Sequence, residues 1–266
     1  MVFGVDGDFG VEGVSRFNNA RATIEGLSAV DLTVNIKITD GFDESLRAAG
    51  YIRQFYWKEE DAWELDLKSA DIGGLDSLQS DNVDILFIST HGMNEDGISY
   101  LLYNSKDGEL SPTSKDPKGW ITSSKDWKLG DGDLEWLAIY SCHTIALEDF
   151  ATKGFSRYQN IFNRLHLMLG SIDTMYMGDP YIDVGRNFAD NLIDGDTIKS
   201  AWMSGVNELN DNHPAVLSAE LESTWKDGSL DWPNTTMQRD MYWGRGKVTA
   251  DVDPKSLYWI GIMWLE

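Results

Sequence analysis

Two continuous apolar runs give the clearest strand pattern in this chain. Residues 84–90 and 134–141 are apolar through their middle, and the runs end at His91 and at Cys142. Apolar runs that do not alternate with polar residues predict strands buried on both faces, as in a parallel sheet covered by helices.

The N-terminal third combines both periodicities. Residues 34–38 alternate between apolar and polar side chains, which predicts a strand with one buried face. Residues 41–50 predict a helix, because Phe42 and Leu46 lie four positions apart and a glycine follows. The aromatic and acidic residues 54–66 predict a strand followed by a loop.

Beyond the second apolar run, helical spacing recurs three times. Apolar residues follow it over 155–165, over 188–192 and over 198–209, and Asp196 is the expected N-cap of the last helix. Strands and helices that alternate along a chain predict an α/β sheet.

Shorter patterns predict further strands. Residues 166–170 and 257–265 are apolar enough for two of them. Residues 98–103 predict one arm of a hairpin that turns at residues 106–108, and the polar residues 111–119 predict a loop.

Composition adds limits on size and partners. The 266 residues contain no linker or repeat, so a single domain over residues 1–266 is expected. Its 44 acidic and 22 basic residues give a net charge of -22, which repels nucleic acid and anionic membranes and attracts basic peptides or divalent cations. With neither a run of about 20 apolar residues nor a basic and apolar leader, a cytoplasmic protein is expected.

The only cysteine excludes an internal disulfide and a cysteine-cluster metal site. The carboxyl ends of parallel strands meet at one edge of a sheet, so Cys142 and His91 are expected close together there. Nucleophilic sulfur chemistry needs a thiol, an acid or base, and donors for an oxyanion. Gly92 has no side chain, so its N–H can approach a substrate carbonyl closely.

These motifs carry a family resemblance. An apolar strand that ends in His91-Gly92, followed by one that ends in Ser141-Cys142, resembles the caspase-like cysteine peptidases: caspases, metacaspases, legumains, gingipains, separases and bacterial CHAT domains. Ser141-Cys142-His143 is most similar to the metacaspase version. Residues 191–202, which end in Ala-Trp, are similar to a segment of CHAT and gingipain-like domains.

The resemblance covers about residues 80–210 of the chain. The flanking residues 1–79 and 211–266 are expected to extend the same domain. The N-terminal third looks like an uncharacterised microbial family within this fold.

The resemblance implies a three-layer α/β sandwich with a mainly parallel central sheet and helices on both faces. It implies that Cys142 is the nucleophile and that His91 is the general acid that protonates the leaving amine. The backbone amides of Gly92 and Cys142 would form the oxyanion hole. The implied activity is hydrolysis of protein or peptide substrates through a thioester, without a cofactor.

One departure from the metacaspase pattern concerns specificity. Metacaspases carry an aspartate two residues before the cysteine, where it helps to bind a basic substrate side chain. Tyr140 stands at that position in this chain, which puts a basic specificity in doubt.

Two other classes of function stay open. One is a catalytically inactive caspase-like domain that binds a peptide or protein partner, and the other is a carbohydrate-binding domain. The aromatic residues in polar segments that could line a groove for either ligand are Trp57, Trp63, Trp120 and Trp127. A Cys142 exposed beside His91 would favour the peptidase, and a Cys142 buried under residues 111–119 would favour the inactive domain.

The other histidines and acidic turns are weaker candidates. His143 would point away from Cys142 if its strand continued. His166 adjoins an apolar strand as a core residue, and His213 precedes a proline in a loop. A zinc site formed by His143 with the two catalytic candidates lacks a fourth ligand. Residues 131–133, Asp-Gly-Asp, are the candidate for Ca²⁺, although they lack the ligand spacing of a calcium loop.

Overall fold

The computed structural model describes residues 2–6, 15–18, 33–57, 62–103, 121–209, 211–221, 225–226, 229–230 and 237–265. The predicted hairpin turn at residues 106–108, the polar residues 111–119 and Trp120 lie outside the described residues.

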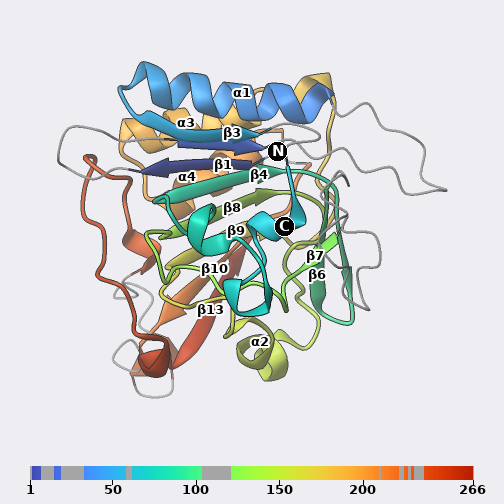
Figure 1. Ribbon diagram of the computed structural model, residues 1–266, viewed down its shortest axis with the longest axis vertical. Helices are drawn as coiled ribbons and strands as arrows, with labels where there is room; N and C mark the ends of the chain where they lie inside the picture. Colours follow the sequence, from blue (N-terminus) through green and yellow to red (C-terminus); the bar gives the residue numbers. More distant parts are fainter. Residues whose placement is uncertain are drawn as a thin grey trace.

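The central element of the described chain is a mixed sheet of eight strands. Its strands are β1 (Val2–Asp6), β2 (Ser15–Asn18), β3 (Ile52–Trp57), β4 (Ile85–Ser89), β8 (Trp136–Tyr140), β9 (Leu167–Ser171), β10 (Pro214–Glu220) and β13 (Trp259–Trp264). Their order is β13-β10-β9-β8-β4-β1-β2, and β3 also pairs with β1 (Figure 1). The strands predicted at residues 84–90, 134–141, 166–170 and 257–265 are confirmed as β4, β8, β9 and β13.

The sheet is not mainly parallel, as the resemblance had implied. Only β4, β8 and β9 run parallel to one another, and the other pairings are antiparallel. Between β9 and β10 the chain forms two packed helices, α3 (Val184–Asp194) and α4 (Ile198–Val206). Helix α4 runs back along α3, so the chain returns to the edge of the sheet at which β9 ends. Strand β10 starts at that edge and therefore runs antiparallel to β9.

Side chains on the two faces of the sheet form two separate cores. Helix α1 (Thr33–Ala48) joins α3 and α4 on one face, where Phe42 stacks on Phe87 and Phe188 at centroid distances of 4.7 and 5.3 Å. Helix α2 (Phe150–Tyr158) covers the other face together with residues of the segment 62–83. The expected α/β class, with helices on both faces, is therefore confirmed.

The predicted strand at residues 34–38 is wrong, because this segment begins helix α1. Ile38, Phe42 and Leu46 repeat every four residues and are fully buried on the sheet-facing side of the helix. Asn35, one turn earlier, is buried as well and accepts a hydrogen bond from the Ser89 hydroxyl at 2.9 Å. The long helical repeat outweighs a short alternation, and the helix predicted at 41–50 is confirmed as its second half.

The helix predicted over residues 155–165 ends earlier than the spacing of its apolar residues indicates, because α2 ends at Tyr158. Beyond it, Ile161, Phe162 and Leu165 are buried without being helical. They fill the core from an irregular segment, so their spacing reflects burial and not a continuous helix.

The predicted helices at 188–192 and 198–209 are confirmed as α3 and α4. The N-cap of α4 is nevertheless Thr197 and not Asp196. The Thr197 hydroxyl accepts a hydrogen bond from the Ser200 N–H at 3.2 Å. This is the bond that a helix N-cap is expected to provide.

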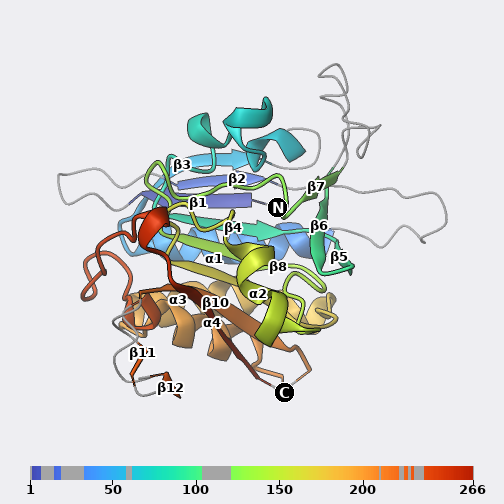
Figure 2. The same ribbon diagram turned by 90° about the horizontal axis from the view of Figure 1, so that it is seen from below.

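A second sheet, of three strands, lies beside the carboxyl end of β4 (Figure 2). Its strands are β5 (Gly92–Glu95), β6 (Ile98–Leu102) and β7 (Ile121–Ser123). The strand predicted at 98–103 is thus confirmed as β6, but its hairpin partner β5 precedes it. Asp96 and Gly97 form the turn with φ angles of 52° and 77°, the left-handed conformation that two-residue hairpin turns need. Among the described residues, no helix has the length and apolar character to cross a membrane.

Candidate active site

Strands β4 and β8 bring His91 and Cys142 to one edge of the sheet. The two strands are parallel neighbours, and Ser89 lies opposite Tyr140 in their last pair. One residue further on, the Thr90 N–H still donates to the Tyr140 carbonyl at 3.3 Å. His91 and Cys142 each lie two residues beyond that last pair, so the two strands bring them to the same edge of the sheet.

Both residues are half-buried, and Cys142 lies on the face that carries α1, α3 and α4. Tyr140 points into the core on that face, and Cys142, two positions later, packs against the same core. Cys142 and His91 each keep part of their surface exposed. Residues 111–119, the cover for the thiol that the inactive-domain alternative requires, lie outside the described residues.

Gly92 comes very close to the Cys142 segment. A Cβ atom at position 92 would overlap the Ser141 hydroxyl and lie 2.6 Å from the Cys142 carbonyl oxygen. In the hairpin, the Leu102 N–H donates to the His91 carbonyl at 3.0 Å, which makes theirs a hydrogen-bonded pair. Such pairs alternate with non-bonded pairs in an antiparallel ladder, so the Gly92 N–H points away from β6.

The Cys142 amide is also outside the sheet ladder. It follows the end of β8, and it donates a hydrogen bond to no other residue in the part of the chain that the structure describes. The two amides expected to bind an oxyanion are therefore not used by pairing between strands. An oxyanion hole needs such donors fixed in place before the reaction.

The Cys142 thiol contacts the loop that follows β9. Its Sγ accepts a hydrogen bond from the Met175 N–H at 3.3 Å and lies 3.6 Å from the Met175 carbonyl oxygen, to which the thiol can donate. Burial raises the pKa of the thiol, although the Met175 backbone opposes the shift. Within the described residues, no hydrogen bond or ion pair joins the thiol to His91.

Burial lowers the pKa of His91. A raised thiol pKa and a lowered imidazole pKa both favour the neutral forms at pH 7. The pair is therefore a thiol and an imidazole at rest, and not a thiolate and an imidazolium.

Tyr140 anchors the loop over the thiol. Its hydroxyl donates to the Tyr176 carbonyl at 2.5 Å and accepts from the Asn212 side-chain amide at 3.2 Å. The Asn212 side-chain oxygen accepts from the Tyr176 N–H at 2.8 Å. Tyr140, two residues before Cys142, therefore holds the residue next to Met175.

Residues 11–263 match a family described as a domain of unknown function, DUF6345. The chain belongs to the DUF6345 family. No curated protein matches it. The matched range includes β4, β8 and the residues that follow them, so the candidate site of this DUF6345 chain lies inside the family domain.

Among the described residues, no hydrogen bond or ion pair joins the other histidines to the thiol or to His91. His143 follows the end of β8 with a φ of 50°, and its Nε2 lies 3.9 Å from the Asp173 carboxylate. His166 is fully buried, and its Nδ1 lies 2.6 Å from the Asp240 carboxylate, so the expectation of a core residue is confirmed. His213 is half-buried directly before β10.

The acidic turn at residues 131–133 finds no support as a calcium site. The described residues contain no group of three or more His, Cys, Asp or Glu side chains placed to hold a metal ion. Asp81 lies beneath this turn, and its carboxylate accepts a hydrogen bond from the Gly130 N–H at 2.7 Å. Burial raises the pKa of Asp81 to about 8, and the neighbouring Asp131 acts in the same direction.

The tryptophans do not line a common groove at the thiol. Trp127 is buried and donates to the Thr122 hydroxyl at 2.8 Å, while Trp57 stacks on Phe55 at a centroid distance of 4.2 Å. Trp63 is half-buried. Two cavities, of about 370 and 420 Å³, lie near α2, and neither has His91 or Cys142 in its lining.

Sequence reasoning missed the residues that position the site. Met175 and Asn212 belong to no motif and lie far along the chain from Cys142, so no local pattern marks them. The buried cluster around Glu135, His166 and Asp240 was missed as well. Its one sequence signal is a polar residue directly before each of two apolar strands.

Proposed function

We propose that this DUF6345 chain is a caspase-like cysteine endopeptidase that acts through Cys142 and His91. The observation that supports the proposal most is the parallel pairing of β4 and β8, which brings a thiol and an imidazole to the carboxyl ends of two neighbouring strands. The close approach of Gly92 and the amide of Cys142, which lies outside the ladder, add the donors that acyl transfer needs.

In the proposed reaction, the Cys142 Sγ attacks the carbonyl carbon of a peptide bond. The thiol proton passes to His91 during the attack, since both groups are neutral at rest. The Gly92 and Cys142 amides donate to the oxyanion. The C–N bond then breaks as His91 gives its proton to the leaving amine, and water hydrolyses the thioester to restore the thiol.

The test uses Cys142→Ala and His91→Ala, with His213→Ala as the matched control for loss of a half-buried histidine. Cleavage of a random peptide library would be followed by mass spectrometry. We expect His91→Ala to lower the rate about 10²- to 10⁴-fold, the usual contribution of a general acid, and Cys142→Ala to abolish cleavage. Any cleavage by Cys142→Ala, a wild-type rate in His91→Ala, or no cleavage by the wild-type protein would contradict the proposal.

The inactive, peptide-binding domain is the second candidate, and the environment of the thiol favours it. The Cys142 thiol is hydrogen-bonded to the Met175 backbone and not to His91, and burial raises the pKa of this thiol. The rate of iodoacetamide alkylation separates the two functions. If the chain is a peptidase, iodoacetamide should alkylate Cys142 in the folded state, and more slowly in His91→Ala. If it is an inactive domain, Cys142 should be alkylated only when the protein unfolds.

A further inference from the structure

A cavity of about 420 Å³ lies between α2 and the β5–β6 hairpin, away from the candidate active site. Its lining contains three cationic side chains, Lys125, Lys153 and Arg157, and one anionic side chain, Asp96. The whole chain has a net charge of -22. Positive charge is therefore concentrated in this cavity against the general character of the protein.

Arg157 is held in place before any ligand binds. Its Nη1 donates to the Ala146 carbonyl at 3.3 Å and to the Glu148 carbonyl at 3.0 Å. The hairpin turn packs against the guanidinium so closely that a Cβ atom at Gly97 would overlap it. A cation fixed in this way loses little freedom when it pairs with an anion, which favours binding.

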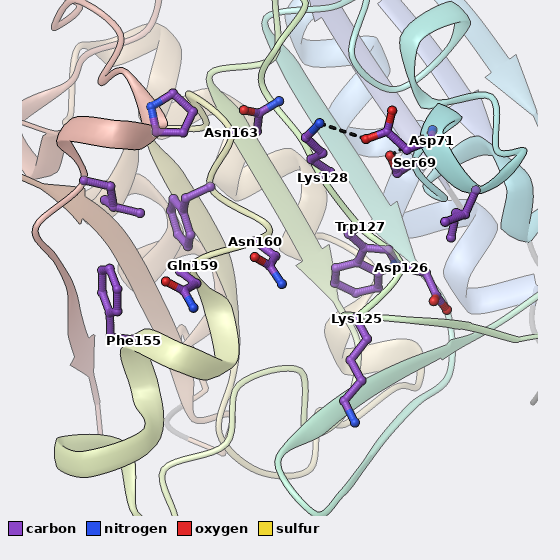
Figure 3. Close-up of a pocket in the computed structure, with 14 residues that line it drawn as sticks. Ser69, Asp71, Lys125, Asp126, Trp127, Lys128, Phe155, Gln159, Asn160 and Asn163 are labelled. Atoms are coloured by element: carbon purple, nitrogen blue, oxygen red, sulfur yellow. Dashed lines mark hydrogen bonds and ion pairs between the residues drawn. The ribbon is translucent and has the colours of Figure 1, made fainter.

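Lys125 is the cation that is free to bind. It is exposed and makes no hydrogen bond or ion pair with the described residues. In Figure 3 its side chain points away from Trp127 and away from Lys128, which pairs with Asp71. Lys153 differs, because Asp149 already binds its ammonium at 2.6 Å.

A second cavity, of about 370 Å³, adjoins the first and shares Lys125 and Asn160 with it. Figure 3 shows the carboxamides of Gln159, Asn160 and Asn163 around it, with the Phe155 ring at its edge. Carboxamides both donate and accept hydrogen bonds, so this cavity suits the polar organic part of a ligand.

We propose that the cavity between α2 and the hairpin binds the phosphate group of a phosphorylated small molecule. Arg157 and Lys125 contact the phosphate oxygens, Lys153 adds charge, and the adjoining cavity receives the rest of the molecule. Arginine matches the geometry of phosphate oxygens, and several cations suit a group that carries about two negative charges. The site does not depend on the peptidase proposal, because neither cavity has Cys142 or His91 in its lining.

Calorimetric titration with pyrophosphate at low salt tests the site. We expect binding in the wild-type protein, and a loss of affinity of about tenfold in Lys125→Gln and in Arg157→Gln, the usual effect of removing a charge-assisted hydrogen bond. Lys37→Gln, on α1, is the matched control and should bind as the wild type does. Because Arg157 also anchors residues 146–148, Lys125→Gln is the decisive variant if Arg157→Gln is unstable.

Asp96→Asn separates loss of charge from loss of structure. Removal of the one anionic lining residue should tighten pyrophosphate binding, by roughly threefold for a surface charge. Damage to the fold would weaken binding instead. In the wild-type protein, pyrophosphate should also slow acetylation of Lys125 but not of Lys37. Absence of binding at millimolar pyrophosphate, or equal affinity in Lys125→Gln and wild type, would overturn the proposal.

Discussion

Small residues next to the catalytic candidates control how closely the two strand ends approach. Gly92 lies against the Ser141 hydroxyl and the Cys142 carbonyl, and this contact keeps the hairpin beside the thiol. Ser141 is fully buried, and its hydroxyl has no hydrogen-bond partner among the described residues. A Cβ atom at position 92 would overlap both the Ser141 hydroxyl and the Cys142 carbonyl oxygen.

Gly92→Ala should therefore perturb the site without changing either Cys142 or His91. We expect a loss of about 1–3 kcal/mol in the free energy of unfolding, the usual cost of overpacking, because the new methyl group must displace the Ser141 hydroxyl. Urea denaturation measures the loss. Gly178→Ala is the control, since a Cβ there meets nothing nearer than Pro180 at 3.7 Å. Equal free energies of unfolding for Gly92→Ala and Gly178→Ala would show that the contact between Gly92 and Ser141 can adjust to a methyl group without cost.

At the scale of elements, the start of helix α4 shows that residue type alone does not identify the N-cap. Asp196 and Thr197 are both good N-cap residues, and only the backbone shows which one caps α4. Thr197 has extended backbone angles and binds the Ser200 N–H, while Asp196 is exposed. Helix α4 carries Trp202, which is fully buried against Phe188 of α3, so the cap supports a large part of the core.

Thr197→Ala and Asp196→Ala should have different effects. We expect Thr197→Ala to lower the free energy of unfolding by about 1 kcal/mol, because the Ser200 N–H loses its acceptor. Asp196→Ala should change it by less than about 0.5 kcal/mol, as most exposed substitutions do. Chemical denaturation measures the free energy of unfolding of both variants. A larger loss in Asp196→Ala than in Thr197→Ala would show that Asp196 caps the helix, as the sequence suggested.

Across the whole molecule, the two ends of the parallel strands differ in chemistry. The carboxyl ends carry Cys142 and His91, while Glu135 and His166 precede the amino ends of β8 and β9. Burial opposes protonation of His166, but the hydrogen bond to Asp240 and the Asp251 carboxylate, 3.5 Å from its Nε2, raise its pKa to about 9. Burial raises the pKa of Glu135 to about 8.

This cluster should make the protein less stable as the pH rises. Burial raises the pKa of nearby Glu220 to about 7 from an ordinary 4.5, and His166 titrates near 9 against an ordinary 6.5. Each group binds its proton more tightly in the folded state, so the stabilisation present at low pH is lost between those values. We expect the free energy of unfolding to fall between about pH 5 and pH 9.

Denaturation at several pH values measures this dependence. Glu220→Gln cannot ionise, so we expect it to reduce the fall below about pH 7 and to leave the fall above it. Stability that rises from pH 6.5 to pH 9 would show that the folded state does not hold these protons.

Local patterns along the chain were sufficient for β4, β8, β9 and β13 and for the identity of the candidate pair, but they did not mark β1, β2 or β10. Long apolar runs predicted β4 and β8 because full burial on both faces requires them, whatever the rest of the fold. A His and the only Cys directly after these strands had to reach one edge once the strands paired in parallel. The same logic failed at residues 34–38, where five alternating positions belong to a helix stripe that continues to Leu46.

The tertiary structure alone determined the direction of the outer strands, the cap of α4, the partners of the thiol and the basic cavity. Met175, Asn212 and Arg157 take their roles from contacts with residues that lie far away in sequence. Such contacts leave no periodicity in the sequence, because only burial that repeats along a helix or a strand produces a periodic pattern. They form when helices and strands pack, which is why the thiol environment could be described only from the folded chain.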